Sequence, residues 1–237
     1  MSEASPSRAS QGENRTEENR QIALLHKAFV AKVYSLTLGL LAVTLVQCLV
    51  FRWIRIKQPL PIFIWVVFIL VALSMLNCFP RTRYTFPVNW LLLFVIIECA
   101  TMAMMYFIQN MSTMEFGLLL LVTTVLMAFL HICGVFAPRP YVPEETCSIC
   151  TSFLMLVVGA VLFVIVLLTD HPNFLLLFFL PIIIMTIILV PYHAEAMHGR
   201  WQILPFRSAL IYSLEMHLDF IVLFLAGSLV LQYVLMK

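Results

Sequence analysis

The sequence predicts an all-α membrane protein, a bundle of seven transmembrane helices, and three observations support this prediction. Of the 237 residues, 62% are hydrophobic and only 11% are charged, with a mean hydropathy of +1.01. Apolar runs of about 20 residues, the length that crosses a bilayer as a helix, recur along the chain. Most charged side chains lie between these runs. A water-soluble domain cannot bury so large an apolar fraction, and helices satisfy their own backbone hydrogen bonds in lipid.

The first 21 residues differ from the rest of the chain. They are rich in Ser, Glu, Asn and Arg and nearly free of large apolar groups, which predicts a disordered cytosolic tail over residues 1–21. Residues 22–237 form the predicted transmembrane domain. Its seven spans are expected at Val30–Phe51, Pro61–Phe79, Val88–Ile108, Phe116–Ala137, Ile149–Thr169, Phe174–Tyr192 and Ala209–Leu235.

Short connections predict that consecutive spans pack antiparallel. Pro181 lies inside the sixth span, where it is expected to kink the helix. The distribution of Lys and Arg between the connections favours a cytosolic N-terminus. An odd number of spans then places the C-terminus on the opposite side of the membrane.

The last span carries three ionisable side chains, Glu215, His217 and Asp219. On insertion scales, a charged side chain inside a span costs about 2.5–3.5 kcal/mol, so such residues usually serve a function. Glu215 and Asp219 are four residues apart and share a helix face, whereas His217 points elsewhere. A hydrogen-bonded structural carboxylate is the alternative interpretation of Asp219.

Glu98 lies near the middle of the third span. It is either a protonated acid that bonds to a neighbouring helix or a ligand on a cation pathway. Calcium prefers six to eight oxygen ligands, so Asp219, Glu98 and Glu215 supply only part of a shell. A transient calcium site at Asp219 and Glu98 is therefore expected rather than a tight one.

Four segments resemble one family, and they occur in its order. Lys27–Tyr34 resembles the start of the first span in the Bax inhibitor–lifeguard family, the transmembrane Bax inhibitor motif-containing proteins. Arg81–Asn89 resembles that family's basic turn, which ends in Pro-x-Asn. Glu98 stands where the family carries a Glu. His217–Leu225 is similar to the family's Tyr-Leu-Asp-Ile-Ile-Asn-Leu-Phe-Leu signature, and the resemblance extends from about Lys27 to the end of the chain.

This resemblance implies the seven-helix fold of the Bax inhibitor type and a function. The family's members let calcium leak from the endoplasmic reticulum or Golgi, lower store calcium and restrain apoptosis. The resemblance therefore implies an integral membrane protein of these organelles that has calcium as its permeant ion and needs no cofactor. It implies no enzymatic activity, no nucleic-acid partner, and cell-death regulators of the Bcl-2 type as protein partners.

The sequence departs from the family at the end of the sixth span. The family has Tyr-Asp-Thr-Gln there, whereas this chain has Tyr192-His193-Ala194-Glu195. The family's pH-responsive pair of aspartates is thus reduced to Asp219, with His193 in the place of its partner. A His and an Asp stabilise each other's charged form, so the exchange should change the pH response. Glu195 or Glu215 restores an acid–acid pair if either one reaches Asp219.

The basic turn has two interpretations. By resemblance, Arg81 and Arg83 form a latch that pairs with the acids at the cytosolic end. Alternatively, the two arginines only fix the orientation of the helices in the membrane.

Two other functions remain open. An intramembrane zinc-dependent hydrolase of the ceramidase or adiponectin-receptor type could draw its ligands from His131, His193, His198, His217 and Asp219. The five-residue spacing of His193 and His198 counts against it, because two ligands on one helix face are usually four apart. The third alternative is a non-conducting family member that acts only through protein partners.

Overall fold

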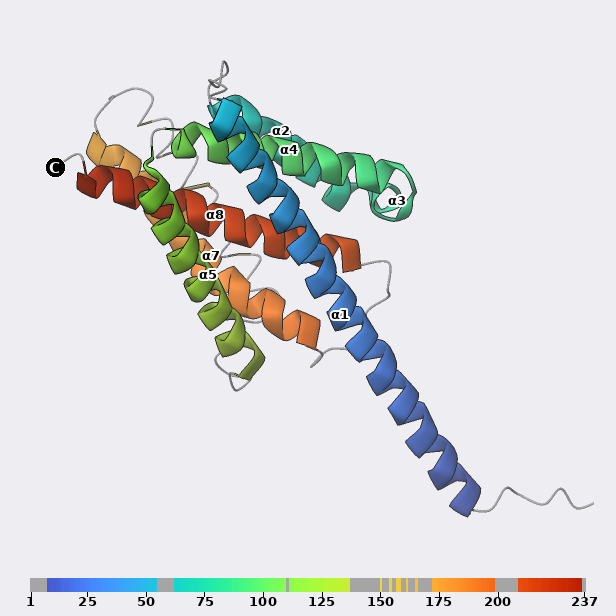
Figure 1. The fold of residues 1–237 in the computed structure, drawn as a ribbon. Helices are drawn as coiled ribbons and strands as arrows, with labels where there is room; N and C mark the ends of the chain where they lie inside the picture. The colour runs from blue at the N-terminus through green and yellow to red at the C-terminus, as the bar shows by residue number, and fades with distance from the viewer. Residues whose placement is uncertain are drawn as a thin grey trace, which may run out of the picture.

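The computed structural model describes residues 8–54, 62–109, 111–136, 172–198 and 209–235, with single positions between 150 and 165. All regular structure in these ranges is helical, which confirms the prediction of an all-helical membrane protein (Figure 1). The helices are α1 (Arg8–Ile54), α2 (Ile62–Cys78), α3 (Pro80–Tyr84), α4 (Val88–Ile108), α5 (Thr113–Phe136), α7 (Pro172–His198) and α8 (Ala209–Leu235).

The described residues support a membrane protein but do not establish seven spans. The helical segments that are long and apolar enough to cross a bilayer are Glu17–Ile54, Val88–Ile108, Thr113–Phe136 and Ala209–Leu231. Ile64–Leu76 of α2 and Ile183–His198 of α7 are apolar but shorter. The predicted fifth span, Ile149–Thr169, lies outside the described residues except for single positions. The number seven therefore stays a prediction.

Helix α1 begins earlier than the sequence predicts. Residues 1–21 are expected to be disordered, yet the helix starts at Arg8 and continues without interruption to Ile54. No proline occurs between these two residues, and Glu, Gln and Arg are good helix formers, so nothing in the sequence ends the helix as it leaves the apolar stretch. Figure 1 shows this first part of α1 extending away from the other helices.

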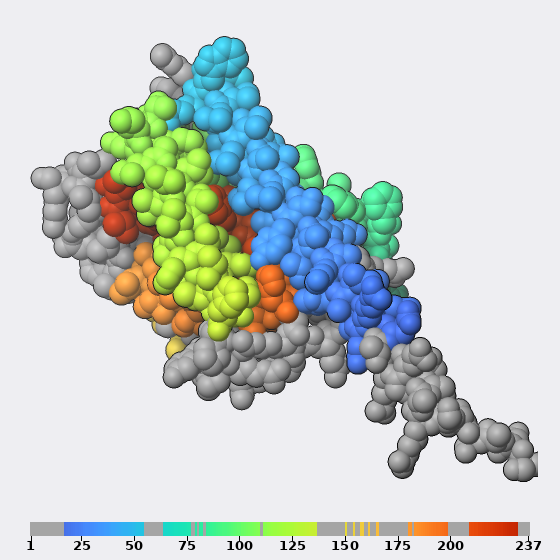
Figure 2. All heavy atoms as spheres, turned by 60° about the horizontal axis from the view of Figure 1, so that its bottom comes forward, coloured from blue at the N-terminus to red at the C-terminus, as the bar shows by residue number. Residues whose placement is uncertain are grey.

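Helix α8 is the centre of the described bundle. It packs against α1, α4, α5 and α7, and α1 and α5 cover much of it in the space-filling view (Figure 2). Phe224 is fully buried in a cluster formed with α1, α4 and α5, while Leu214 packs with α2 and α4. Met216 packs with α1 and α7, and Leu223 with α5 and α7. Every face of α8 therefore contacts protein along part of its length.

The outer surface of the bundle is apolar as well. On α5, the exposed side chains Leu118, Leu121, Val125 and Phe129 recur every three or four residues and so form one stripe along the helix. A stripe of this kind is costly in water and stable in lipid. The bundle is therefore apolar inside and outside, and its few buried polar groups stand out.

Helices α5 and α7 touch backbone to backbone at Gly134 and Pro191. A Cβ atom on Gly134 would lie 2.5 Å from the Pro191 Cα and 2.8 Å from the Pro191 carbonyl carbon. Those atoms belong to a helix backbone and cannot turn aside as a side chain does. Since His131 lies one turn before Gly134 and His193 two residues after Pro191, this contact fixes how closely their two helices approach.

We predict that Gly134→Ala destabilises the protein. The added methyl group has no space, and overpacking of this kind typically costs about 1–3 kcal/mol in the free energy of unfolding. The measurement is thermal or chemical unfolding of the purified protein in detergent. Gly117→Ala on the same helix is the matched control, because no atom lies within 4 Å of a Cβ at Gly117. Similar stabilities of the two variants would contradict the close approach.

Candidate functional site

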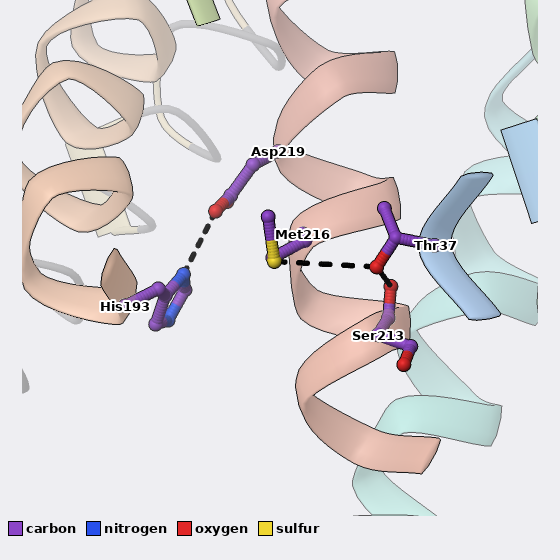
Figure 3. Close-up of polar contacts among 5 residues, drawn as sticks. All are labelled: Thr37, His193, Ser213, Met216 and Asp219. Atoms are coloured by element: carbon purple, nitrogen blue, oxygen red, sulfur yellow. Dashed lines mark hydrogen bonds and ion pairs between the residues drawn. The ribbon is translucent and has the colours of Figure 1, made fainter. Parts of the chain in front are cut away.

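The sequence-predicted pair of His193 and Asp219 is present in the structure. His193 Nδ1 lies 2.8 Å from Asp219 Oδ2, and this contact joins α7 to α8 (Figure 3). The side chains are only 15% and 10% exposed. An ionised carboxylate accepts hydrogen bonds and donates none, so Nδ1–H of His193 is the donor when Asp219 is charged. Protonation of the second ring nitrogen turns this hydrogen bond into an ion pair.

The other two acids near this pair occupy different positions. Glu215 lies one helical turn before Asp219 and contributes to the electrostatic environment of His193. Glu195 is buried in α7, two residues after His193. The contact that the structure gives to Asp219 is with the histidine, so the arrangement is a His–Asp pair with a second carboxylate nearby on α8.

His217 lies on the opposite side of α8, as the helical spacing predicts. Its Nε2 is 3.5 Å from Thr44 Oγ1 of α1, and its side chain is fully buried. Thr101 of α4 continues this polar contact, with its hydroxyl 3.5 Å from Thr44 Oγ1 and 3.3 Å from Oε1 of the Gln47 side chain. The Gln47 amide then donates to Glu98 Oε1 at 2.7 Å. A row of polar groups thus runs from α8 across α1 to Glu98 on α4.

This row explains how Glu98 is accommodated in an apolar bundle. The carboxyl group accepts a hydrogen bond from a neighbouring helix, a contact that is compatible with both interpretations of Glu98, and it also ends a continuous polar path. Sequence reasoning missed Thr44, Gln47 and Thr101. Their signal was the presence of polar side chains within apolar spans, at a spacing that places Thr44 and Gln47 on one face of α1.

Small polar residues hold α1 and α8 close together next to the His–Asp pair. Ser213 Oγ lies 3.1 Å from the Val33 carbonyl oxygen, and Thr37 Oγ1 lies 3.5 Å from the Ser213 carbonyl oxygen. Thr37 also contacts the sulfur of Met216 at 4.0 Å (Figure 3). Both hydroxyls also bond within their own helices, so each is satisfied without water.

The basic turn forms the short helix α3, whose main contacts are with α2 and α4. Arg81 is exposed there, and no ion pair joins Arg81 to an acid within the described residues. The side chain of Arg83 lies outside the described part. The structure therefore shows no latch between Arg81 and Asp219, and the role predicted for Arg83 stays a prediction.

A second group of histidines meets where α1, α5 and α7 come together. The hydroxyl of Tyr34 is hydrogen-bonded to His131 Nε2 and lies 2.7 Å from His198 Nε2. His26 Nε2 lies 3.1 Å from the Met197 carbonyl oxygen. The sequence predicted His131 and His198 as possible metal ligands, but it did not predict that Tyr34 lies between them.

The described residues do not bring the whole ligand set of the zinc-hydrolase alternative together at one place. Within them, no group of three or more His, Cys, Asp or Glu side chains is arranged to hold a metal ion. His217 contacts Thr44, and His193 contacts Asp219. These two histidines of the predicted ligand set therefore have different partners.

Comparison with known proteins yields no match: no family model, no curated protein and no solved structure matches the chain. A functional assignment therefore depends on the motifs of the sequence and the geometry of the site.

We predict an energetic coupling between His193 and Asp219. Removing one partner of a buried pair typically costs about 3–5 kcal/mol, because the other charge stays buried without it. The loss in the double variant His193→Ala/Asp219→Ala should therefore be smaller than the sum of the single losses by about 0.5–3 kcal/mol. Unfolding of all variants in detergent measures this difference. Asp219→Ala combined with Thr124→Ala, an exposed site on α5, is the control and should be additive.

Proposed function

We propose that the protein is a calcium-leak protein of an intracellular membrane, gated by the contact between His193 and Asp219. The observation that carries the proposal is this contact, a 2.8 Å His–Asp pair between two helices of a largely apolar bundle. A helix that only had to fill the bilayer gains nothing from such a pair, since burying ionisable groups costs energy. A pair that can open gives α7 and α8 two states.

The ion pathway in this proposal uses the polar groups around α8. Asp219 and Glu215 supply carboxylate oxygens on the side of α7. Glu98 supplies a third carboxylate, at the end of the polar row that passes through Gln47. These oxygens are fewer than calcium prefers, so an ion binds weakly and passes on. Weak binding suits a leak, because conduction requires that an ion can leave each site.

The gate depends on protonation of His193. When the imidazole is charged, it forms an ion pair with Asp219, and the two helices are held together. As the pH rises through the pKa of His193, the imidazole loses its charge and the attraction is reduced to a neutral hydrogen bond. The leak is therefore lowest in mild acid and increases with pH. A difference of about 1–3 kcal/mol between the states corresponds to about a 5–150-fold change in their ratio.

The resemblance to the Bax inhibitor–lifeguard family adds the cellular part of the proposal. The chain crosses the membrane of the endoplasmic reticulum or Golgi seven times, with its N-terminus in the cytosol. By lowering store calcium it restrains apoptosis, and regulators of the Bcl-2 type are its proposed partners. No catalytic step and no cofactor enter this function.

We predict that calcium flux from liposomes holding the purified protein increases with pH between 5.5 and 8. The midpoint should lie at or above about 6.5, the ordinary pKa of a histidine. Asp219→Asn should flatten the dependence, because no charge pairing remains. His193→Asp should shift it, because a proton shared by two carboxylates then replaces the imidazolium charge.

The control for these variants is Glu18→Gln, which removes an exposed carboxylate far from the pair. It should leave the flux curve unchanged. Superimposable curves for the wild type and His193→Asp would sink the proposed gate, since the only titrating difference at the contact would then have no effect. Absence of flux at every pH would sink the leak itself and favour a role through protein partners.

The proposed topology has its own test. Protease-accessible tags before residue 1 and after Lys237 should be cleaved from opposite sides of the membrane, with the N-terminal tag cytosolic. Tags on the same side would contradict an odd number of spans and show that one predicted span does not cross the bilayer.

A further inference from the structure

Three side chains from three helices converge at one end of the bundle. Tyr34 of α1, His131 of α5 and His198 of α7 place two imidazole Nε2 atoms within hydrogen-bond distance of one phenol oxygen. The two imidazole centroids are 5.7 Å apart. All three residues are partly buried, so the cluster is neither sealed in the core nor spread over the surface.

The number of protons in the cluster determines the direction of its hydrogen bonds when no metal is bound. The hydroxyl of Tyr34 has one proton, so it can donate to one imidazole and must accept from the other. His131 Nδ1 is buried and has no partner within the described residues. A proton on this nitrogen would be a buried donor without an acceptor, so His131 carries its proton on Nε2. His131 therefore donates to Tyr34, and Tyr34 donates to His198.

The two imidazole Nε2 atoms and the phenol oxygen can also serve as metal ligands. We propose that Tyr34, His131 and His198 bind one divalent transition-metal ion of the zinc and copper type and thereby tie α1, α5 and α7 together. Imidazole nitrogen and phenolate oxygen suit these ions, whereas calcium and magnesium prefer carboxylate and carbonyl oxygens. The site supplies three donors, two imidazoles and one phenolate, which leaves the fourth position of a tetrahedral ion to water.

Metal binding displaces two protons of the cluster. Both Nε2 lone pairs have to face the ion, so the proton of His131 shifts from Nε2 to Nδ1, and the phenol releases its proton to solvent. The phenol oxygen withdraws by about one metal–ligand bond length, roughly 2 Å, from the point between the imidazoles. Since the new proton on His131 Nδ1 lacks an acceptor, only an ion with high affinity for imidazole offsets this cost. Copper(II) therefore binds more tightly than zinc.

A neighbouring contact keeps the ligands in place. His26 lies two helical turns before Tyr34 on the same face of α1, and its ring bonds to the carbonyl oxygen of Met197, the residue before His198. Helix α1 thus holds two consecutive residues of α7. Across the cluster, the approach of Gly134 to Pro191 sets the distance between α5 and α7. The site shares no residue with the His193–Asp219 pair, and its proposal does not depend on the proposed leak.

Copper(II) is the probe for this site, because copper(II) bound to a phenolate has a charge-transfer absorption that copper(II) bound only to imidazoles lacks. Titration of metal-free, full-length protein in detergent should produce this band and saturate at one equivalent. A large excess of Zn²⁺ should displace copper(II) from part of the sites and reduce the band, whereas the same excess of Ca²⁺ or Mg²⁺ should leave it unchanged. Zn²⁺ alone should also raise the Tm of the wild type.

The variants separate the three donors. Tyr34→Phe should bind copper(II) without the band, and Tyr84→Phe, an exposed tyrosine elsewhere, should keep it. His131→Ala and His198→Ala should each weaken binding beyond the roughly 10–100-fold that loss of a supporting hydrogen bond causes. Circular dichroism shows whether the alanine variants fold, and Tyr34→Phe provides the test if they do not. No stoichiometric binding, or identical spectra for the wild type and Tyr34→Phe, would overturn the proposal.

Discussion

The burial of polar side chains on α8 is the constraint on which the rest of the bundle depends. Glu215, His217 and Asp219 lie in a helix that packs against four others, so each must find a partner from a different helix or remain costly. His193 of α7 meets Asp219, and Thr44 of α1 meets His217. The identity of the neighbours of α8 is thus specified by polar contacts, while apolar packing alone would tolerate several arrangements.

Two polar contacts on opposite sides of one helix are mechanically related. Asp219 and His217 are two residues apart, so a rotation or shift of α8 that breaks the contact with His193 also moves the imidazole of His217 against Thr44. The row of hydrogen bonds from Thr44 through Thr101 and Gln47 then transmits the shift towards Glu98. In the proposed leak, the gate and the inner acid therefore respond to the same movement.

Features that depend on local sequence were predictable. Contacts between residues that are far apart in the sequence were not. The bounds of α4 and α8 agree with the predicted spans because long, predominantly apolar runs define them. The two faces of α8 followed from the helical repeat. The pairing of His193 with Asp219 came from a resemblance, and no spacing rule gives it. The polar contacts of Tyr34 and Gln47 were not predicted because their partners are far away in the sequence. Helix α1 extends to Arg8 because polar residues with good helix propensity can continue a helix.

In the proposed leak, a histidine rather than an acid at residue 193 affects the charge beside the pathway as well as the strength of the contact between α7 and α8. A charged His193 with Asp219 has no net charge, so it neither attracts nor repels a cation at long range. Loss of the imidazole proton leaves one negative charge, next to Glu215, in a region of low dielectric where charges act strongly. Deprotonation thus weakens the contact between α7 and α8 and draws cations towards it. Both effects have the same sign, so in the proposed leak the release of a single proton from His193 would both weaken the contact and attract a divalent ion.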